Sequence, residues 1–86
     1  MTYTLCWNEG AKYDLRMLGK AEALRIVKKL ESHLVRDPLS LGKPLSANLS
    51  GIYRYRIGNY RVLYQVIQKD LVVMVVRIGH RKEVYG

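Results

Sequence analysis

Arginine side chains dominate the part of this sequence that could do chemistry. The 86 residues include 15 Lys and Arg against 7 Asp and Glu, which gives a net charge of +8 at pH 7. Seven of the basic residues but only two of the acidic ones lie in residues 51–86, and residues 52–68 contain no acid. A guanidinium group can donate two parallel hydrogen bonds to one phosphate, and each neutralised phosphate releases condensed counterions. The second half of the chain is therefore predicted to bind a polyanion.

The candidate functional residues share this half of the chain. They are Arg54, Arg56, Arg61, Arg77, Arg81, His80 and Tyr85. For any single arginine, a solvated position on a sheet is the simpler interpretation. Ordinary solvated surfaces mix charges of both signs, however, so phosphate binding is favoured for the set.

The acidic residues of this half do not suit a metal site. Metal-dependent cleavage of a phosphodiester requires clustered carboxylates, and only Asp70 and Glu83 are available here. His33 and His80 fall on different predicted elements, so no His/Cys ligand spacing is present. No metal ion or cofactor is expected. The remaining chemistry is cleavage of RNA by its own 2′-OH, which the protein must align while it stabilises the phosphorane and manages two protons.

Two residues near Arg81 could transfer those protons. His80 has a suitable ordinary pKa, although a surface or partly packed imidazole is an equally good interpretation. Tyr85 lies near the end of the chain, where its ring could stack on a base or could lie at a frayed end. The sequence does not rank these alternatives.

An N-terminal strand and two helices must come before these residues. Residues 2–7 alternate between apolar and polar side chains, which predicts a strand. Asn8 is a good N-cap for a first helix that Gly19 would end. A second helix is predicted over residues 21–35, with a buried stripe of Leu24, Val27, Leu30 and Leu34. The short break at Gly19 implies an antiparallel helical hairpin.

A loop and three strands complete the predicted fold. Residues 37–51 read as a loop whose leucines hold it to the body of the protein. Strands are predicted at 52–57, 60–68 and 71–78, and the tight breaks between them favour a three-stranded antiparallel meander. The fold class is therefore α+β, a single domain over residues 1–86 with helices on one face of one sheet.

Alternation along the strands predicts what lies on the uncovered face. In the last two strands, Val62, Tyr64 and Val66 form one apolar set, and a second set is Val72, Met74, Val76 and Ile78. The arginines fall on the opposite parity, which gathers Arg54, Arg56, Arg61, Arg77 and, beyond a glycine, Arg81 on the uncovered face. Arginines that converge without an interleaved acid repel one another until an anion binds.

Other features of the chain bear on its location. The single Cys6 cannot form an internal disulfide, which fits a reducing compartment, and it is interpreted as a buried small hydrophobe. No basic-then-apolar signal pattern begins the chain, and the apolar run at 71–76 is too short to cross a bilayer. A cytoplasmic location without a membrane partner is expected.

The whole chain resembles the RelE branch of the RelE/ParE toxin family. The resemblance is carried by Gly51-Ile-Tyr-Arg-Tyr-Arg-Ile-Gly-Asn-Tyr-Arg-Val-Leu-Tyr-Gln-Val66 and by Val75-Val-Arg-Ile-Gly-His-Arg-Lys-Glu-Val-Tyr85. The helical hairpin and the Gly42-Lys-Pro-Leu45 segment match as well. The resemblance implies a toxin of a toxin–antitoxin pair that a RelB-like antitoxin neutralises. It further implies an mRNA interferase that cleaves messenger RNA in the ribosomal A site, by 2′-OH attack that leaves a 2′,3′-cyclic phosphate.

The resemblance also implies roles for individual residues. Arg61 is similar to the family's phosphate-stabilising arginine, Arg81 to the arginine that protonates the leaving oxygen, and Tyr85 to the tyrosine that stacks on or orients the substrate. Arg54 and Arg56 stand where the best-known members have lysines. A lysine can lose its proton in a cationic cluster whereas arginine effectively cannot, so either His80 is the base or general-base help is weak.

One further departure from the family and two alternatives to the nuclease interpretation stay open. The chain ends at Gly86 without the helix that relatives often have after the tyrosine. One alternative is a ParE-like inhibitor of DNA gyrase, which would not need the pairing of Arg81 with Tyr85. The other is a non-catalytic RNA- or ribosome-binding module, since arginine at 54 and 56 preserves anion binding without a base.

Overall fold

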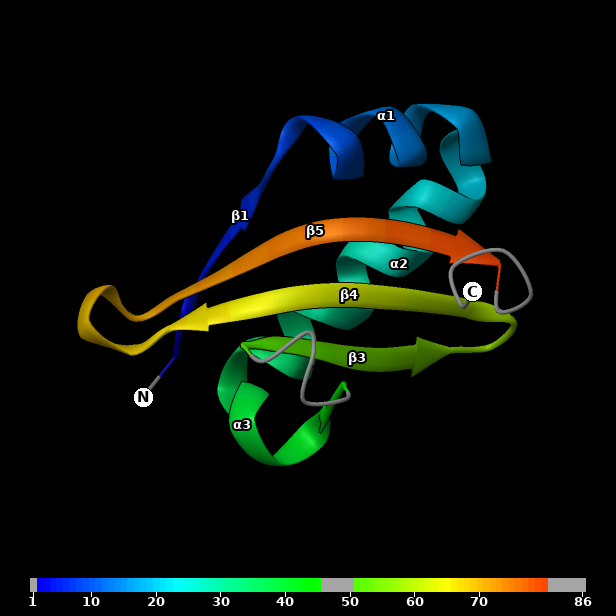
Figure 1. Cartoon of the computed structure of the whole chain (residues 1–86). Coiled ribbons are helices and arrows are strands. Elements are labelled where there is room, and N and C mark those ends of the chain that lie inside the picture. The colour runs from blue at the N-terminus through cyan, green and yellow to red at the C-terminus, as the bar shows by residue number, and fades with distance from the viewer. Residues whose placement is uncertain (1, 46–50, 81–86) are drawn as a thin grey trace.

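The computed structural model describes residues 2–45 and 51–80. Within this part, the chain forms a five-stranded sheet with helices packed against it (Figure 1). The elements follow in the order β1 (Thr4–Trp7), α1 (Glu9–Leu18), α2 (Lys20–Ser32), the 3₁₀ turn η1 (Leu34–Arg36), α3 (Pro38–Leu41), β2 (Lys43–Pro44), β3 (Ile52–Ile57), β4 (Tyr60–Ile67), the 3₁₀ turn η3 (Gln68–Asp70) and β5 (Val72–His80). The predicted α+β class, with the meander of β3, β4 and β5, is confirmed.

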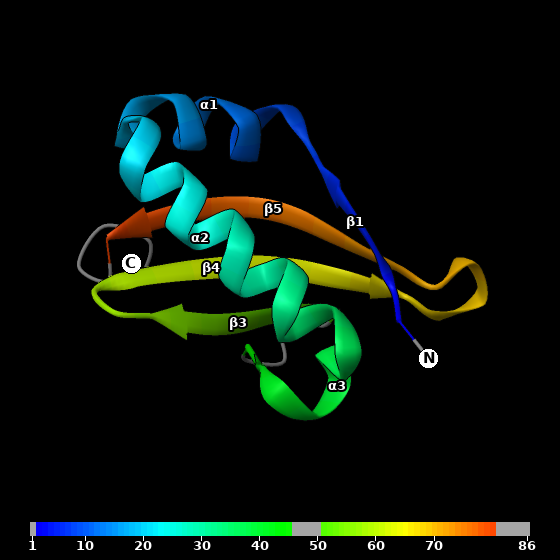
Figure 2. The ribbon, with the colours of Figure 1, turned by 180° about the vertical axis from the view of Figure 1, so that it is seen from behind.

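The sheet has the strand order β1-β5-β4-β3-β2. β4 pairs antiparallel with both β3 and β5, whereas β1 pairs parallel to β5, with Thr4 opposite Val72 and Trp7 opposite Val75. β1 can pair in this way because the two helices carry the chain away from it before the meander begins. α2 crosses one face of the sheet, and α1 lies along β5 (Figure 2). No described element crosses the other face.

Local signals place the two helices. The side chain of Asn8 accepts a hydrogen bond from the amide of Ala11 at 2.9 Å, which confirms it as the N-cap of α1. Gly19 separates α1 from α2 with a φ of 88°, a conformation that glycine adopts without strain. The predicted stripe of α2 is partly wrong: Ile26 and Leu30 are fully buried, whereas Leu24 is 54% exposed. The apolar side chains of α2 cover more than one face, and packing on the sheet selects the face that contains Ile26.

The segment predicted as a loop contains two short elements. α3 begins at Pro38, which suits the first turn of a helix, and β2 pairs with β3 through Lys43 and Pro44. Leu39 and Leu41 are exposed by 38% and 36%, so these two leucines do not hold the segment to the body. Among the described residues of this stretch, Pro38 and Gly42 are the buried ones.

A β-bulge in β5 changes which of its side chains reach the core. Leu63 pairs with Arg77 while the next residue, Tyr64, pairs with Val75, so Val76 is the extra residue. Val73 and Val75 are therefore buried before the bulge and Ile78 after it. The prediction that Val72, Met74, Val76 and Ile78 share one apolar face is wrong for Val72 and Met74, because Val73 and Val75 face the core instead. The bulge also moves Arg77 to the uncovered face.

The core lies between α2 and the covered face of the sheet. Its fully or nearly fully buried members are Ala11, Ile26, Leu30, Leu34, Tyr55, Ile57, Val62, Tyr64, Val73, Val75 and Ile78. Cys6 is only partly buried, because its side chain lies on the uncovered face, next to Met74 in the register. No helix in the described ranges is long and apolar enough to span a membrane.

Candidate nucleic-acid interface

Three arginines of neighbouring strands lie together on the uncovered face. Arg56 in β3 pairs directly with Arg61 in β4, and Arg54 lies two residues earlier in β3 on the same face. Tyr55, between the two arginines of β3, points into the core instead. Side chains directly opposite in an antiparallel pair have Cβ atoms about 5 Å apart, and like charges in such pairs destabilise the sheet. The predicted gathering of Arg54, Arg56 and Arg61 on one face is thus present.

These arginines line a pocket of about 230 Å³ at the β3 side of the sheet. Its lining residues are Leu41, Lys43, Arg54, Tyr55, Arg56 and Arg61. Lys43 joins the cluster, hereafter the arginine pocket, because β2 pairs it with Arg54. Lys43 was not among the predicted site residues, since a two-residue strand that contains Pro44 gives no periodic signal in the sequence. The pocket is smaller than sites for drug-sized ligands and suits a compact anionic group.

The chemistry of the arginine pocket follows from its donors. A phosphate held there would be close to four cationic side chains, whose N–H groups can form charge-assisted hydrogen bonds. Donors that are fixed before the reaction stabilise the extra negative charge of a phosphorane. Each guanidinium is already protonated near neutral pH and has no lone pair that could accept another proton, so Arg54, Arg56 and Arg61 can bind and stabilise but cannot act as a general base.

A buried tyrosine holds the wall of the pocket in place. The hydroxyl of Tyr64 donates a hydrogen bond to the carbonyl oxygen of Pro38 at 2.7 Å, which fixes α3 against the sheet. Burial raises the pKa of Tyr64 well above its ordinary value. Gly42 passes so close that a Cβ atom added to it would lie 1.8 Å from the Tyr64 hydroxyl oxygen and 2.9 Å from the carbonyl oxygen of Arg54. Only glycine fits at residue 42 without movement, and this fit places Lys43 beside Arg54.

A second tyrosine ties the core side of β3 to the end of α2. The hydroxyl of Tyr55 shares a hydrogen bond with Nδ1 of His33, and the two rings lie 5.8 Å apart. Burial raises the pKa of Tyr55. His33 is the residue that follows α2, so this bond connects the helix terminus to the strand that carries Arg54 and Arg56. The sequence offered no signal for it, because the two residues are 22 positions apart.

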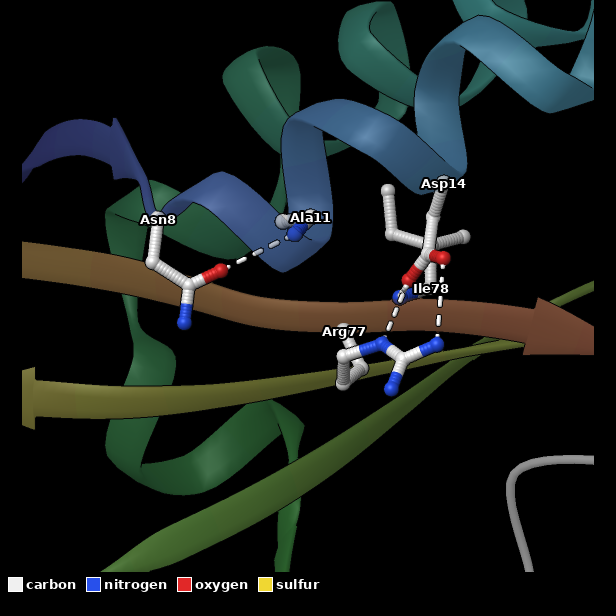
Figure 3. Close-up of polar contacts among 5 residues, drawn as sticks. All are labelled: Asn8, Ala11, Asp14, Arg77 and Ile78. Atoms are coloured by element: carbon white, nitrogen blue, oxygen red, sulfur yellow. Dashed lines mark hydrogen bonds and ion pairs between the residues drawn. The ribbon is translucent and has the colours of Figure 1, made fainter.

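Arg77 reaches the uncovered face but is paired with an acid. Its Nε and Nη2 donate to the carboxylate oxygens of Asp14 in α1 at 2.8 and 3.2 Å (Figure 3). The same carboxylate accepts the buried amide of Ile78 at 2.8 Å. The hydrogen bonds that Arg77 donates to the Asp14 carboxylate raise the pKa of Arg77. The expectation of arginines without an interleaved acid is therefore wrong at Arg77, because α1 supplies a carboxylate from the first half of the chain.

His80 lies apart from the arginine pocket. It pairs with Tyr60 in the sheet, and their rings meet edge to face at 6.1 Å. Tyr60 faces α2. The pKa of Glu22 in α2 is lowered mainly by its hydrogen bond with Arg25, and a hydrogen bond with Tyr60 adds a smaller contribution. His80 therefore points to the helix side, into a hollow of about 300 Å³ that Met17 and Leu18 also line. Gly79, not His80, stands beside Arg61.

Two predicted site residues, Arg81 and Tyr85, lie outside the described residues. Within the described ranges, no three His, Cys, Asp or Glu side chains are placed to share a metal ion.

Comparisons with known proteins identify the family. Residues 5–85 match the family model described as the ParE toxin of the type II toxin–antitoxin system, parDE. The chain is 34% identical over 85 residues to toxin RelG of Mycobacterium tuberculosis, which covers 99% of this chain and 98% of RelG. It is 32% identical over 88 residues to the mRNA interferase toxin RelE of Escherichia coli, with 100% and 93% covered.

Solved structures give the same result. A crystal structure of the RelBE2 toxin–antitoxin complex of Mycobacterium tuberculosis superposes with a TM-score of 0.88 at 32% identity, over 96% of this chain and 95% of that one. A free mutant of the Escherichia coli toxin RelE superposes with a TM-score of 0.78 at 28% identity, over 98% and 88%. The chain belongs to the RelE/ParE superfamily of toxins from type II toxin–antitoxin systems.

Proposed function

We propose that this toxin is a metal-independent endoribonuclease that cleaves messenger RNA in the A site of the ribosome. The observation that carries the proposal is the arginine pocket, in which Lys43, Arg54, Arg56 and Arg61 converge on one small hollow. The relatives named as mRNA interferases at 32% identity support the same activity. Because the ribosome and its messenger are the substrates, the proposal implies a cytoplasmic protein.

In this proposal the protein acts mainly through electrostatics. Arg61 would stabilise the phosphorane formed when the 2′-OH attacks the adjacent phosphate, while Arg54 and Arg56 hold the phosphate. Arg81 would protonate the leaving 5′ oxygen, and Tyr85 would stack on or orient a base. Arg77 is kept as a weaker substrate contact, because its charge is shared with Asp14.

His80 has a conditional part in the mechanism. Histidine is the side chain that most often acts as a general base, but the side chain of His80 points to the helix side of β5. A base role for His80 thus requires that the RNA reach around the end of that strand. If His80 does not take part, the 2′-OH proton would pass to solvent water, and the reaction would depend on alignment and phosphorane stabilisation.

A RelB-like antitoxin is the proposed protein partner, since several superposable toxins were solved in complexes with RelB. We expect the antitoxin to be acidic where it crosses the arginine pocket and apolar where it meets the helices. The large exposed apolar side chains of the helices support this second contact: Tyr13, Met17 and Leu24 are exposed by 54%, 68% and 54%.

Primer extension on a defined messenger, in a purified translation system with and without stalled ribosomes, tests the activity. We expect breaks at the A-site codon only with ribosomes. Arg61→Ala and Arg81→Ala should each reduce cleavage by about 10²–10³-fold, the effect of losing one transition-state donor. His80→Asn should lower it by the 10²–10⁴-fold typical of a lost base if His80 takes the proton, and by far less otherwise.

An intact messenger with the wild-type protein would overturn the nuclease proposal. The match to a ParE family model keeps a gyrase inhibitor as the second candidate. Inhibition of DNA supercoiling by purified gyrase would then support that candidate. If the protein binds ribosomes but neither cleaves RNA nor inhibits gyrase, the result would support a non-catalytic RNA- or ribosome-binding module.

A further inference from the structure

A second basic hollow lies around the edge of the sheet from the arginine pocket. It has a volume of about 580 Å³ and opens between α2 and the turn that joins β3 to β4. We call it the α2 groove. Its lining residues are Arg25, Lys28, Lys29, Ser32, Arg56, Ile57 and Gly58.

Helical spacing explains why the basic residues of α2 share this groove. Arg25, Lys28, Lys29 and Ser32 follow one another at intervals of three, one and three residues, which places them on one stripe of the helix. All four are exposed, whereas Ile26 and Leu30 of the same helix are buried in the core. The core-facing side of α2 therefore fixes the direction in which the basic stripe points.

The charge in the α2 groove is only partly compensated. Arg25 is paired with Glu22, at 3.1 and 3.3 Å. Its guanidinium packs over the β3–β4 turn: a Cβ atom added to Gly58 would lie 3.7 Å from each of the two terminal nitrogens of Arg25. For Lys28, Lys29 and Arg56, no carboxylate partner is found within the described ranges. Three cationic side chains thus face one hollow.

Arg56 connects the two hollows, since it lines both the arginine pocket and the α2 groove. β2 pairs only with Arg54 and Tyr53, so the last residues of β3 have no described strand on that side. A chain of phosphates that occupied the arginine pocket could therefore continue past Arg56 toward Lys28 and Lys29.

The lining of the groove favours a nucleic-acid backbone over a protein. Protein interfaces have an apolar or aromatic centre that is poor in lysine. Here Ile57 is the one large apolar side chain in the lining, and it is 6% exposed. Flexible lysines and a serine hydroxyl contact phosphate and sugar oxygens without reading the sequence.

We propose that the α2 groove binds the sugar–phosphate backbone of RNA at phosphates other than the one that is cleaved. It would act as a sequence-independent anchor that adds affinity to the arginine pocket. The RNA could be the messenger strand continuing from the pocket or a structured ribosomal RNA. The inference rests on the proposed function only for the identity of the polyanion, and it does not require cleavage.

The test measures binding to an RNA that cannot be cleaved. A fluorescent, fully 2′-O-methylated oligonucleotide of about ten nucleotides, within the length that single-strand sites cover, lacks the attacking hydroxyl. Its dissociation constant is measured by anisotropy over a range of KCl concentrations. The test variant is Lys28→Gln with Lys29→Gln. The control, Lys20→Gln with Lys69→Gln, removes the same charge from exposed residues outside both hollows.

We expect the test variant to lose roughly ten-fold in affinity near physiological salt and the log–log salt slope to fall by about 1.4, since each single-strand phosphate contact contributes about 0.7. The affinity and the salt slope of the control variant should change far less. Equal losses in both variants would mean a net-charge effect, and no loss in the test variant would mean no contact. Either result overturns the anchor.

Further binding measurements identify the source of the RNA and separate the anchor proposal from the nuclease proposal. A loss confined to the single strand would assign the groove to the messenger. An additional loss on a 2′-O-methylated hairpin and on small ribosomal subunits would assign it to ribosomal RNA. Because none of these measurements involves cleavage, the anchor can hold if the nuclease proposal fails, and the reverse also applies.

Discussion

The carboxylate of Asp14 has two partners, and the structure predicts that they contribute very differently to stability. One partner is the amide of Ile78, which is buried and bonded at 2.8 Å. β1 ends at Trp7, which is paired with Val75, so no described strand pairs with the later residues of β5 on that edge, and Asp14 supplies the acceptor. The other partner is Arg77, whose side chain is 59% exposed.

The free energies follow from these surroundings. Removing an ionised acceptor from a buried amide costs about 1.5–3 kcal/mol, because the donor is left without a partner. An ion pair with one well-solvated member contributes about 0.2–1 kcal/mol. Asp14→Ala should therefore lower the free energy of unfolding by about 2–3 kcal/mol. Arg77→Ala should lower it by less than about 1 kcal/mol. In Asp14→Asn the amide oxygen can still accept the hydrogen bond from Ile78, so its loss of unfolding free energy should lie between those of the two alanine variants.

The same substitutions should change RNA binding in the opposite direction. Asp14→Asn removes the charge that neutralises Arg77, which then adds an uncompensated cation to the uncovered face. The variant is less stable but should bind single-stranded RNA a few-fold more tightly, with a salt slope steeper by up to about 0.7. Adding Arg77→Ala to Asp14→Asn should abolish that gain.

Urea unfolding followed by the fluorescence of Trp7, the single tryptophan, measures the stability changes. With a slope near 1–1.5 kcal/mol/M for a domain of this size, Asp14→Ala should lower the midpoint by about 2 M. Anisotropy with the 2′-O-methylated oligonucleotide measures the binding. Equal costs for Asp14→Ala and Arg77→Ala would refute the assignment of the stability to Ile78. Unchanged RNA binding by Asp14→Asn would refute the claim that Asp14 restrains Arg77.

Two further predictions concern Tyr64 and its neighbours. Gly42→Ala places a methyl group 1.8 Å from the Tyr64 hydroxyl oxygen, so it should cost about 2–4 kcal/mol of unfolding free energy and weaken RNA binding by moving Lys43. Ser40→Ala, at an exposed residue of the same segment, is the control, and equal stability of the two variants would contradict the close approach. Burial raises the pKa of Tyr64, so above pH 10 the unfolded chain loses a proton that the folded chain keeps. The free energy of unfolding should then fall with pH, by up to about 1.4 kcal/mol per unit. Tyr64→Phe should make that fall shallower in urea titrations at several pH values, and an unchanged slope would argue against it.

Sequence patterns predicted the elements wherever one local signal decides the structure. The two ends of α1, at Asn8 and Gly19, were predicted because helix capping involves only neighbouring residues. The β3–β4 pair was predicted well because Gly58 adopts a positive φ in its turn and period-2 alternation runs unbroken along both strands. The uncovered position of Arg54, Arg56 and Arg61 follows from that regularity.

The predictions failed where distant parts of the chain decide the structure. The stripe of α2 contains Ile26 rather than Leu24, because the sheet selects one of two apolar faces. The bulge at Val76 reverses the parity of β5, and no residue type at that position announces it. Asp14 meets Arg77 across 63 residues, which neither alternation nor spacing can reveal.

The position of His80 bears on how a protein with arginine at residues 54 and 56 could cleave RNA. The arginines at 54 and 56 bind phosphate at any physiological pH, but neither can accept the proton of the 2′-OH. The register places Gly79 beside Arg61 and turns His80 toward Tyr60, on the helix side of the sheet. Proton acceptance by His80 would therefore be separated from phosphate binding by the thickness of the sheet. This separation favours a mechanism in which stabilisation of the phosphorane, rather than removal of a proton by His80, provides most of the acceleration.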